Sequence, residues 1–345
     1  MTAIQDIFTT FAKCFIHKFA CTGFHIMKHL LICKSILLSF MFLAISCSPE
    51  VEIIESELAY QAEATTGEGS IWHPDRQTLF WVDIEGQTLY EYDPEKDECG
   101  SWKFDRMIST VVPETDSTVI VALQNEIVRI NLHGGQTVSI APIPDKEGKV
   151  RCNDGKCDPA GRLWVGTMGF GAPKGAGTLY CVSPDGKVST KIKKVTISNG
   201  IVWSSNRKFM YYNDTPTRKI ARYRYDADNG DILFDGIAVS LSEDAGAPDG
   251  MTIDSNDNLW VAQWGGHGVY CYNPYTGELL AKVNVPAPHV ASCAFGGKKM
   301  DVLYITTARA GLSEEQLQEY PLSGSVFSCK PGVKGVASNS FGLPQ

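Results

Sequence analysis

The signatures of several common enzyme and binding-site classes are missing from this chain of 345 residues. It has no CxxC pair and no Cys/His cluster with zinc-ligand spacing, which argues against a structural zinc site. It has no G-x-S-x-G motif, which argues against a serine hydrolase built on a nucleophile elbow. No long segment shows helical periodicity, so a helical bundle is disfavoured as well.

Basic runs are also absent, and the charge balance is acidic. Lys and Arg number 31 against 39 Asp and Glu, giving a net charge of −8. Residues 1–46 hold four Lys and one Asp, so the remainder carries a net charge of −11. Such a surface argues against nucleic acid or an anionic membrane surface as a partner.

The N-terminal segment has the composition of an export signal. Met27 and Lys28 open a short basic region, residues 36–45 are apolar, and small residues precede Cys47 in the manner of a bacterial lipobox. We predict a lipoprotein signal peptide over residues 27–46, with residues 1–26 as an untranslated upstream segment. The alternative is an uncleaved membrane anchor. The expected location is the periplasm, outer membrane or cell surface of a bacterium, with membrane attachment only through the lipid.

Seven cysteines follow Cys47. An odd number in an exported protein leaves at least one free thiol, and we expect these residues to act mainly as small core side chains. A disulfide between some pair stays open, because connectivity cannot be deduced from sequence.

The chain repeats one pattern six times at a spacing of roughly 40 to 50 residues. Each copy has a Gly, a short apolar strand, a polar turn, an apolar or aromatic strand and a third, alternating strand, which is typical of β-hairpins. The four clear copies are "GSIWHPDRQTLFWVDI", "GKCDPAGRLWVGTM", "GIVWSSNRKFMYYND" and "GMTIDSNDNLWVAQW", and weaker ones occur around residues 109–123 and 292–308.

Repeats of this length, each unable to bury its own sheet faces, pack radially. The sequence therefore predicts an all-β fold, a six-bladed β-propeller over residues 58–345, preceded by a tether over residues 47–57. A β-helix, the main alternative, requires much shorter repeats. We expect a monomer or a weak dimer.

Polar residues recur just before the first strand of four repeats. They are Glu68, Asp154 with Asn153 before it, Asn199 and Asp249. Because the first strand of a propeller blade lines the central channel, these side chains are expected to converge near one mouth. Carboxylate and amide oxygens there are ligands for a divalent cation.

Asp-Gly and Asn-Gly are also the commonest hairpin turns, so an ordinary turn is the alternative for each pair. The segment "SPDGKVS" at residues 183–189 offers an internal control, because its Pro-Asp-Gly follows a third strand and reads as a plain turn. Position within the repeat, rather than the dipeptide, favours a single site.

The segments "TGEGSIW", "RCNDGKCDPAGRLWVGTM", "SNGIVWSSNRKFMYYND", "PDGMTIDSNDNLWVAQWGG" and "LYITTAR" closely resemble the regucalcin/gluconolactonase (SMP-30-like) family. The resemblance covers residues 63–335. It implies a six-bladed propeller and a sugar lactone lactonase. The metal ligands that it implies are Glu68, Asn199 and Asp249.

The same resemblance implies that Arg151 and Asn153 contact substrate, and that Asp154 has a structural role in capping the turn. Family members often carry an acidic residue shortly after "GTM", where this chain has Gly169, Phe170 and Gly171.

Two further residues are predicted near the pocket. His289 precedes the first strand of the sixth repeat, and Trp264 ends a strand; a loop position and core packing are the alternatives. His73, His133 and His267 are expected to be solvated.

The implied reaction is hydrolysis of a gluconolactone-like lactone to its aldonic acid. One divalent ion, with Ca²⁺ favoured over Zn²⁺, Mn²⁺, Mg²⁺ or Fe²⁺, acts as Lewis acid, and Asp249 is the candidate general base. Hydroxide held by the cation is the alternative nucleophile. Two alternative functions stay open: a metal-stabilised binding or scaffold module without catalysis, and a hydrolase of other esters or phosphotriesters.

Overall fold

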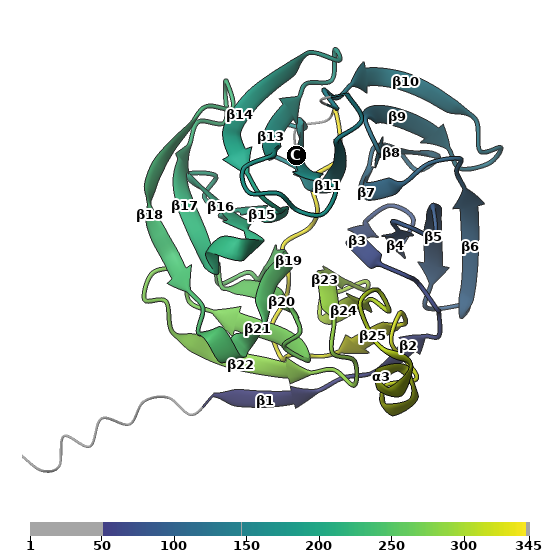
Figure 1. Ribbon diagram of the computed structural model, residues 1–345, viewed down its shortest axis with the longest axis vertical. Coiled ribbons are helices and arrows are strands. Elements are labelled where there is room, and N and C mark those ends of the chain that lie inside the picture. The colour runs from purple at the N-terminus through teal and green to yellow at the C-terminus, as the bar shows by residue number, and fades with distance from the viewer. Residues whose placement is uncertain (1–50, 146, 343–345) are drawn as a thin grey trace, which may run out of the picture. The chain divides into compact units, whose positions relative to one another are not determined.

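The computed structural model of the protein describes residues 51–145 and 147–342. These residues form six sheets arranged around a central axis (Figure 1), so the predicted six-bladed propeller is confirmed. The predicted signal peptide and the lipidation at Cys47 fall on residues 1–50, outside the described residues. No helix in the described part is long and apolar enough to cross a membrane.

Blades 1 to 4 are four-stranded antiparallel sheets whose strands follow one another in chain order. Blade 1 contains β3 (Gly67–His73), β4 (Thr78–Asp83), β5 (Thr88–Asp93) and β6 (Glu98–Lys103). Blade 2 contains β7 (Ile108–Pro113), β8 (Thr118–Leu123), β9 (Glu126–Asn131) and β10 (Thr137–Pro142). Blade 3 contains β11 (Val150–Cys157), β12 (Leu163–Gly169), β13 (Gly177–Val182) and β14 (Val188–Val195). Blade 4 contains β15 (Ser198–Trp203), β16 (Phe209–Asp214), β17 (Lys219–Tyr225) and β18 (Ile232–Ser240), with the short 3₁₀ helix η1 (Thr215–Thr217) after β16.

Blades 5 and 6 each take up a strand from the start of the described chain. Blade 5 contains β19 (Ala247–Ile253), β20 (Leu259–Trp264), β21 (Gly268–Tyr272) and β22 (Leu279–Asn284), preceded by the 3₁₀ helix η2 (Glu243–Ala245), and β1 (Glu52–Glu55) joins it in parallel beside β22. Blade 6 contains β23 (Val290–Gly296), β24 (Val302–Thr307) and β25 (Val326–Cys329), completed by β2 (Glu57–Tyr60). The domain was expected to begin at Leu58, after a tether. Strands of its sheets instead begin at Glu52.

The first strand of every blade lies innermost, as the repeat predicted (Figure 1). The second strands are packed between blades on both faces, which is why segments such as "TLFWVD" in β4 are apolar nearly throughout and wholly buried. Aromatic rings fill the seams between blades. Trp164 of blade 3 and Trp203 of blade 4, for example, meet edge to face with ring centroids 5.8 Å apart.

Cysteines contribute to this core. Of the seven within the described residues, six are buried, only Cys99 is partly exposed, and none forms a disulfide. Burial raises the pKa of the Cys152 thiol to about 12, so it stays protonated at neutral pH. The expectation that the cysteines are small core residues is thus confirmed.

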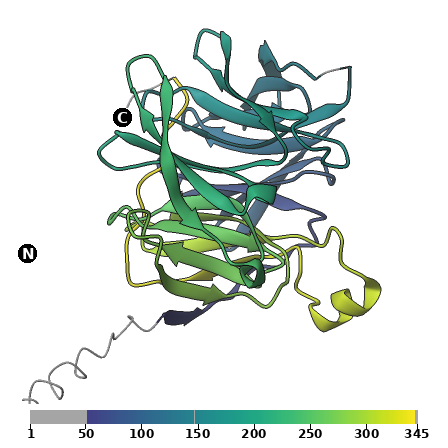
Figure 2. The ribbon, with the colours of Figure 1, turned by 60° about the vertical axis from the view of Figure 1, so that its left-hand side comes forward.

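The C-terminal segment crosses one end of the propeller. Main-chain hydrogen bonds join Val336 to Ile253 in blade 5, and Phe341 to Pro113 in blade 2. The only α-helix of the described residues, α3 (Glu314–Glu319), lies between β24 and β25 and projects from the propeller (Figure 2). Thr307, the last residue of β24, pairs with Val290, the first residue of β23. The connection that carries α3 therefore begins at the end of blade 6 where its inner strand starts.

The ring closure predicts a stability effect. The buried Ser325 hydroxyl donates to the Ala62 carbonyl (2.9 Å) and accepts from the Ala62 N–H (3.2 Å), joining blade 6 to the segment after β2. Ser325→Ala leaves both groups without this partner, so we expect the free energy of unfolding to fall by about 2 kcal/mol in urea titrations. Ser328→Ala, nearby but outside this contact, is the control. Equal stability of both variants and the wild type would contradict the role.

Candidate metal and substrate site

The residues predicted to converge lie at pairing irregularities of the inner strands. Register shifts follow Glu68 in β3 and Asn199 in β15, and similar shifts span Asp154 in β11 and Asp249 in β19. A bulge adds an unpaired residue and re-aims the neighbouring side chains. The four side chains therefore come from one structural position in four blades.

The acid–glycine and amide–glycine pairs are not hairpin turns, because each lies within an inner strand. Of these glycines only Gly69 has a positive φ, 59°. At Gly200 the reason for glycine is close approach: a Cβ there would lie 2.4 Å from Asn213 Nδ2 and 2.6 Å from the Asp249 carbonyl oxygen. The Pro-Asp-Gly segment at residues 184–186, the internal control, differs in both respects. It lies in a turn outside the strands, and its Gly186 has a positive φ of 82°.

Three carboxylates from blades 1, 3 and 5 are buried close enough to repel one another. Glu68, Asp154 and Asp249 are 6 %, 9 % and 4 % exposed. Burial, followed by the charges of Asp249 and Asp154, raises the pKa of Glu68 well above its usual value. Burial and the charge of Asp154 do the same to the pKa of Asp249. Such a cluster is costly unless it binds protons or a cation.

One oxygen of this cluster has no partner. The buried Oδ1 of Asp249 has no donor, whereas Glu68 Oε2 accepts from the Gly69 N–H (2.9 Å), and the Glu68 and Asp249 carboxyls lie close enough to share a proton. Among the described residues no three His, Cys, Asp or Glu side chains are grouped to hold a metal by themselves. The role of the Asn199 amide oxygen as a further metal ligand stays a prediction.

The amides of Asn153 and Asn199 are fixed by a chain of hydrogen bonds. Asn153 Nδ2 donates to Asn199 Oδ1 and to the Ser198 carbonyl, both at 2.8 Å. Asn199 Nδ2 donates to Thr215 Oγ1 at 2.8 Å. Because a carbonyl oxygen has two lone pairs, Asn199 Oδ1 keeps one for a further ligand.

Arg151 lies beside this network. Its Nη1 donates to Asn153 Oδ1 (2.6 Å) and to the Cys152 carbonyl (2.9 Å), and the side chain is half-buried. Burial lowers the pKa of Arg151, and the charges of Glu85, Glu68 and Asp249 oppose this effect. Arg151 and Asn153 are therefore together near the carboxylates, and their contact with substrate stays a prediction.

Asp154 Oδ1 accepts from the Gly155 N–H (2.7 Å), as Glu68 does from Gly69, but within a strand bulge rather than the predicted turn, so its purely structural role stays a prediction. A nearby cation, Lys156, was missed by the sequence reasoning. Its Nζ donates to the Met251 carbonyl in blade 5 (2.8 Å), and its charge lowers the pKa of Asp154 against the larger effect of burial. The available signal was a lysine directly after the glycine in "NDGKC", where the other three clear repeats have Ser, Ile or Met.

His289 and Trp264 contact each other. Their rings stack with centroids 4.2 Å apart, and His289 Nδ1 donates to the Ala310 carbonyl (2.9 Å). A role in the pocket stays a prediction. Phe170, in the segment where the family resemblance leads one to expect an acidic residue, is 45 % exposed.

One histidine differs from expectation. His73 was expected to be solvated, but it is 1 % exposed, and its Nε2 donates to the Thr115 carbonyl (2.9 Å). This bond to the neighbouring blade explains its burial, because it satisfies a ring N–H that would otherwise lose water.

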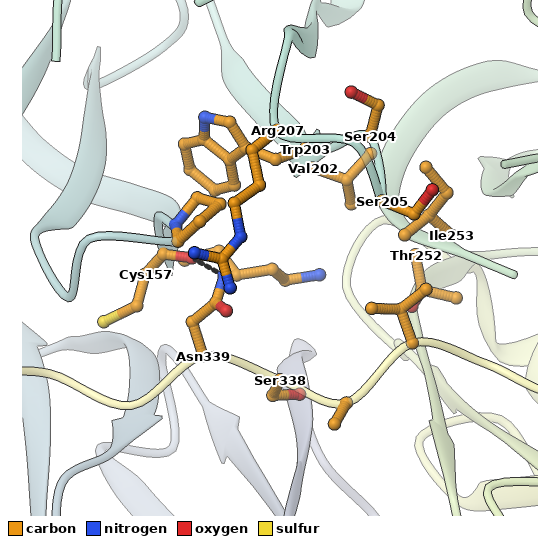
Figure 3. Close-up of a pocket in the computed structure, with 14 residues that line it drawn as sticks. Cys157, Val202, Trp203, Ser204, Ser205, Arg207, Thr252, Ile253, Ser338 and Asn339 are labelled. Carbon is orange, nitrogen blue, oxygen red and sulfur yellow. Dashed lines mark hydrogen bonds between the residues drawn. The ribbon is translucent and has the colours of Figure 1, made fainter. Parts of the chain in front are cut away.

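A cavity of about 190 Å³ (Figure 3) is lined by residues at the other ends of the inner strands, such as Trp203, which ends β15, and Cys157, which ends β11. Trp203, Thr252 and Lys156 line it from blades 4, 5 and 3, and the C-terminal segment covers it through Asn339, whose Nδ2 donates to the Cys157 carbonyl (3.1 Å). Its lining includes none of Glu68, Asp154, Asn199 and Asp249, whereas Lys156 both lines the cavity and acts on the charge of Asp154.

Known proteins are similar in sequence to this chain across most of the propeller. The profile of the family described as "SMP-30/Gluconolactonase/LRE-like region" matches residues 66–309. The chain is 36 % identical over 278 residues to the "Putative sugar lactone lactonase YvrE" of Bacillus subtilis, covering 80 % of this chain and 95 % of that protein. It is 32 % identical over 294 residues to human regucalcin, covering 84 % and 98 %.

Solved structures agree. A calcium-binding protein, regucalcin, from Agrobacterium tumefaciens superposes with a TM-score of 0.80 at 26 % identity, covering 85 % of this chain and 100 % of that one. A luciferin-regenerating enzyme superposes with a TM-score of 0.77 at 32 % identity, covering 83 % and 100 %. The extent and consistency of these matches show that the chain belongs to the SMP-30/gluconolactonase/LRE-like family.

Proposed function

We propose that this chain is a divalent-metal-dependent hydrolase that opens a sugar lactone of the gluconolactone type to its aldonic acid. The observation that carries the proposal is the buried cluster of Glu68, Asp154 and Asp249 beside the Asn199 amide, with one Asp249 oxygen left without a partner. Family membership supports lactonase-type hydrolysis, and the name of the Bacillus subtilis relative supports a sugar lactone as substrate.

The donor set fits a hard divalent cation. Glu68, Asn199 and Asp249 would offer two carboxylates and one amide oxygen, the ligand chemistry that Ca²⁺ takes in proteins. Calcium is our preferred ion, because the Agrobacterium tumefaciens neighbour is titled a calcium-binding protein. When bound, the cation would supply Lewis-acid polarisation of the lactone carbonyl.

The chain's own residues would bind the substrate and move the proton. Arg151 would donate hydrogen bonds to the lactone from its planar fork, while Asn153 keeps that fork in place. The Asp249 carboxylate would accept a proton as water attacks the carbonyl carbon. The bond from that carbon to the ring oxygen then breaks, and the proton passes from Asp249 to the ring oxygen. The products are one new hydroxyl and a carboxylic acid, which loses its proton to solvent.

Turnover with and without chelator tests the proposal. We expect purified protein to hydrolyse members of an aldonolactone panel, to lose that activity in EDTA, and to regain it when Ca²⁺ is restored. A melting temperature that falls in EDTA while no lactone turns over would contradict catalysis and support a scaffold role. Turnover unaffected by EDTA would contradict metal dependence.

Asp249 has an internal control. Asp249→Asn keeps the size of the side chain but removes the base, so at saturating Ca²⁺ we expect kcat to fall by about 10²–10⁴-fold. Asp185→Asn alters the same Pro-Asp-Gly tripeptide in an exposed turn, and its kcat should equal that of the wild type. Retained activity in Asp249→Asn would remove this residue from the mechanism.

The raised pKa values of Glu68 and Asp249 predict a pH effect on the cation-free protein. The folded state keeps protons that the unfolded chain has lost, so stability should fall as pH rises above about 4 through the raised values. A bound cation offsets that charge. The melting temperature in EDTA should therefore decline from about pH 5 to about pH 8 more steeply than with excess Ca²⁺.

Calorimetry under both conditions measures this difference. The pKa values of His73 and His289 are lowered by burial, but these groups act in both conditions and cancel in the comparison. Parallel slopes with and without Ca²⁺ would show that no cation replaces the protons.

A further inference from the structure

Three consecutive polar residues at the end of β16 each bond to a different part of the site's framework. Asn213, Asp214 and Thr215 lie in the second strand of blade 4 and at the start of η1, not in an inner strand. Asp214 accepts from the Thr196 N–H (3.0 Å) and the Ile197 N–H (2.9 Å), which holds the segment entering β15. The other two side chains cross from blade 4 to blade 5.

Thr215 connects two of the three predicted ligands, Asn199 in blade 4 and Asp249 in blade 5, through their neighbouring groups. Its hydroxyl donates to the Pro248 carbonyl (2.9 Å), directly before Asp249, because a carbonyl can only accept. The same oxygen accepts from Asn199 Nδ2 (2.8 Å). That bond fixes which end of the Asn199 amide faces Thr215, and so directs Oδ1 towards Asn153 and the site.

Asn213 provides a second crossing bond. It is fully buried, and its Nδ2 donates to the main-chain carbonyl of Asp249 (2.8 Å). The bond passes over Gly200, where a Cβ would collide with both partners. Pro248 and Asp249 are thus held through consecutive carbonyls by two side chains of one neighbouring segment.

The main chain of Thr215 is itself held in place. Its N–H donates to the Ile197 carbonyl (3.1 Å), and its carbonyl accepts from the Arg218 N–H (3.1 Å) at the end of η1. The hydroxyl therefore stands on a fixed turn, and the geometry that it imposes on Asn199 and Pro248 does not depend on a mobile loop.

We infer that Thr215 and Asn213 are positioning residues that set the distance and orientation between Asn199 and Asp249, and so set the affinity for the cation. The inference rests on the proposed function. Its physical basis is that ligands on separate blades have no covalent reason to keep a fixed separation, whereas outer partners orient ligands and strongly affect metal affinity.

Calcium binding by isothermal titration calorimetry tests the inference on the full propeller. Thr215→Val keeps the shape but removes both hydrogen bonds, and we expect Ca²⁺ affinity to fall by about 10–100-fold. Thr215→Ser restores the hydroxyl and should bind within about threefold of the wild type. Thr217→Val is the matched control, because Thr217 is exposed on the same turn and its hydroxyl bonds locally, donating to the Lys219 carbonyl (3.4 Å) and accepting from the Lys219 N–H (3.3 Å).

The lactonase assay adds a second readout. If Thr215 only positions ligands, excess Ca²⁺ should restore the kcat of Thr215→Val, as it should not for Asp249→Asn. Should Thr215→Val fail to fold by circular dichroism, Thr215→Ala replaces it.

The outcomes separate the two proposals. Wild-type affinity in a folded Thr215→Val or Thr215→Ala, with Ca²⁺ binding by the wild type intact, would overturn the positioning role alone. A wild type that binds no divalent cation would overturn the proposed function and this inference together.

Discussion

Repulsion among buried carboxylates is the constraint on which the centre of this molecule depends. Glu68, Asp154 and Asp249 come from three blades and are nearly excluded from water, where like charges raise one another's pKa. Folding must offset that cost with protons, cations of the chain or a bound ion. Arg151 and Lys156 supply two of the chain's own charges near the cluster, and Asp249 Oδ1 is buried without a hydrogen-bond donor.

Because the three carboxylates lie on three different blades, their separation depends on how closely the inner strands of those blades pack. Each inner strand bulges where its polar side chain stands, and Gly200 leaves space for the Asn213 bond to Asp249 between blades 4 and 5. The glycine that in isolation suggests a hairpin turn serves close approach instead. The charged centre and the tight packing of inner strands are therefore two consequences of one arrangement.

Much of the fold and the candidate site was predictable from local pattern. The six repeats, the inner position of each first strand and the burial of the cysteines follow from hydrophobic periodicity and turn residues, which act over a few neighbours. The pattern also singled out Glu68, Asp154, Asn199 and Asp249, and the family resemblance selected Glu68, Asn199 and Asp249 among them as predicted ligands. The pattern missed the role of Lys156, because the sequence around this lysine does not reveal its partner, the Met251 carbonyl in blade 5. It also predicted that His73 is solvated, because the Thr115 carbonyl that accepts its hydrogen bond belongs to another blade.

The sequence by itself determined which residues stand at the start of each inner strand and how many blades there are, since both depend on short-range order along the chain. Only the tertiary structure decided that β1 and β2 join blades 5 and 6, that Thr215 connects Asn199 to the strand of Asp249, and which side chains lose water. Those outcomes depend on contacts between segments far apart in the chain, whose distances are set by closure of the ring rather than by local propensity.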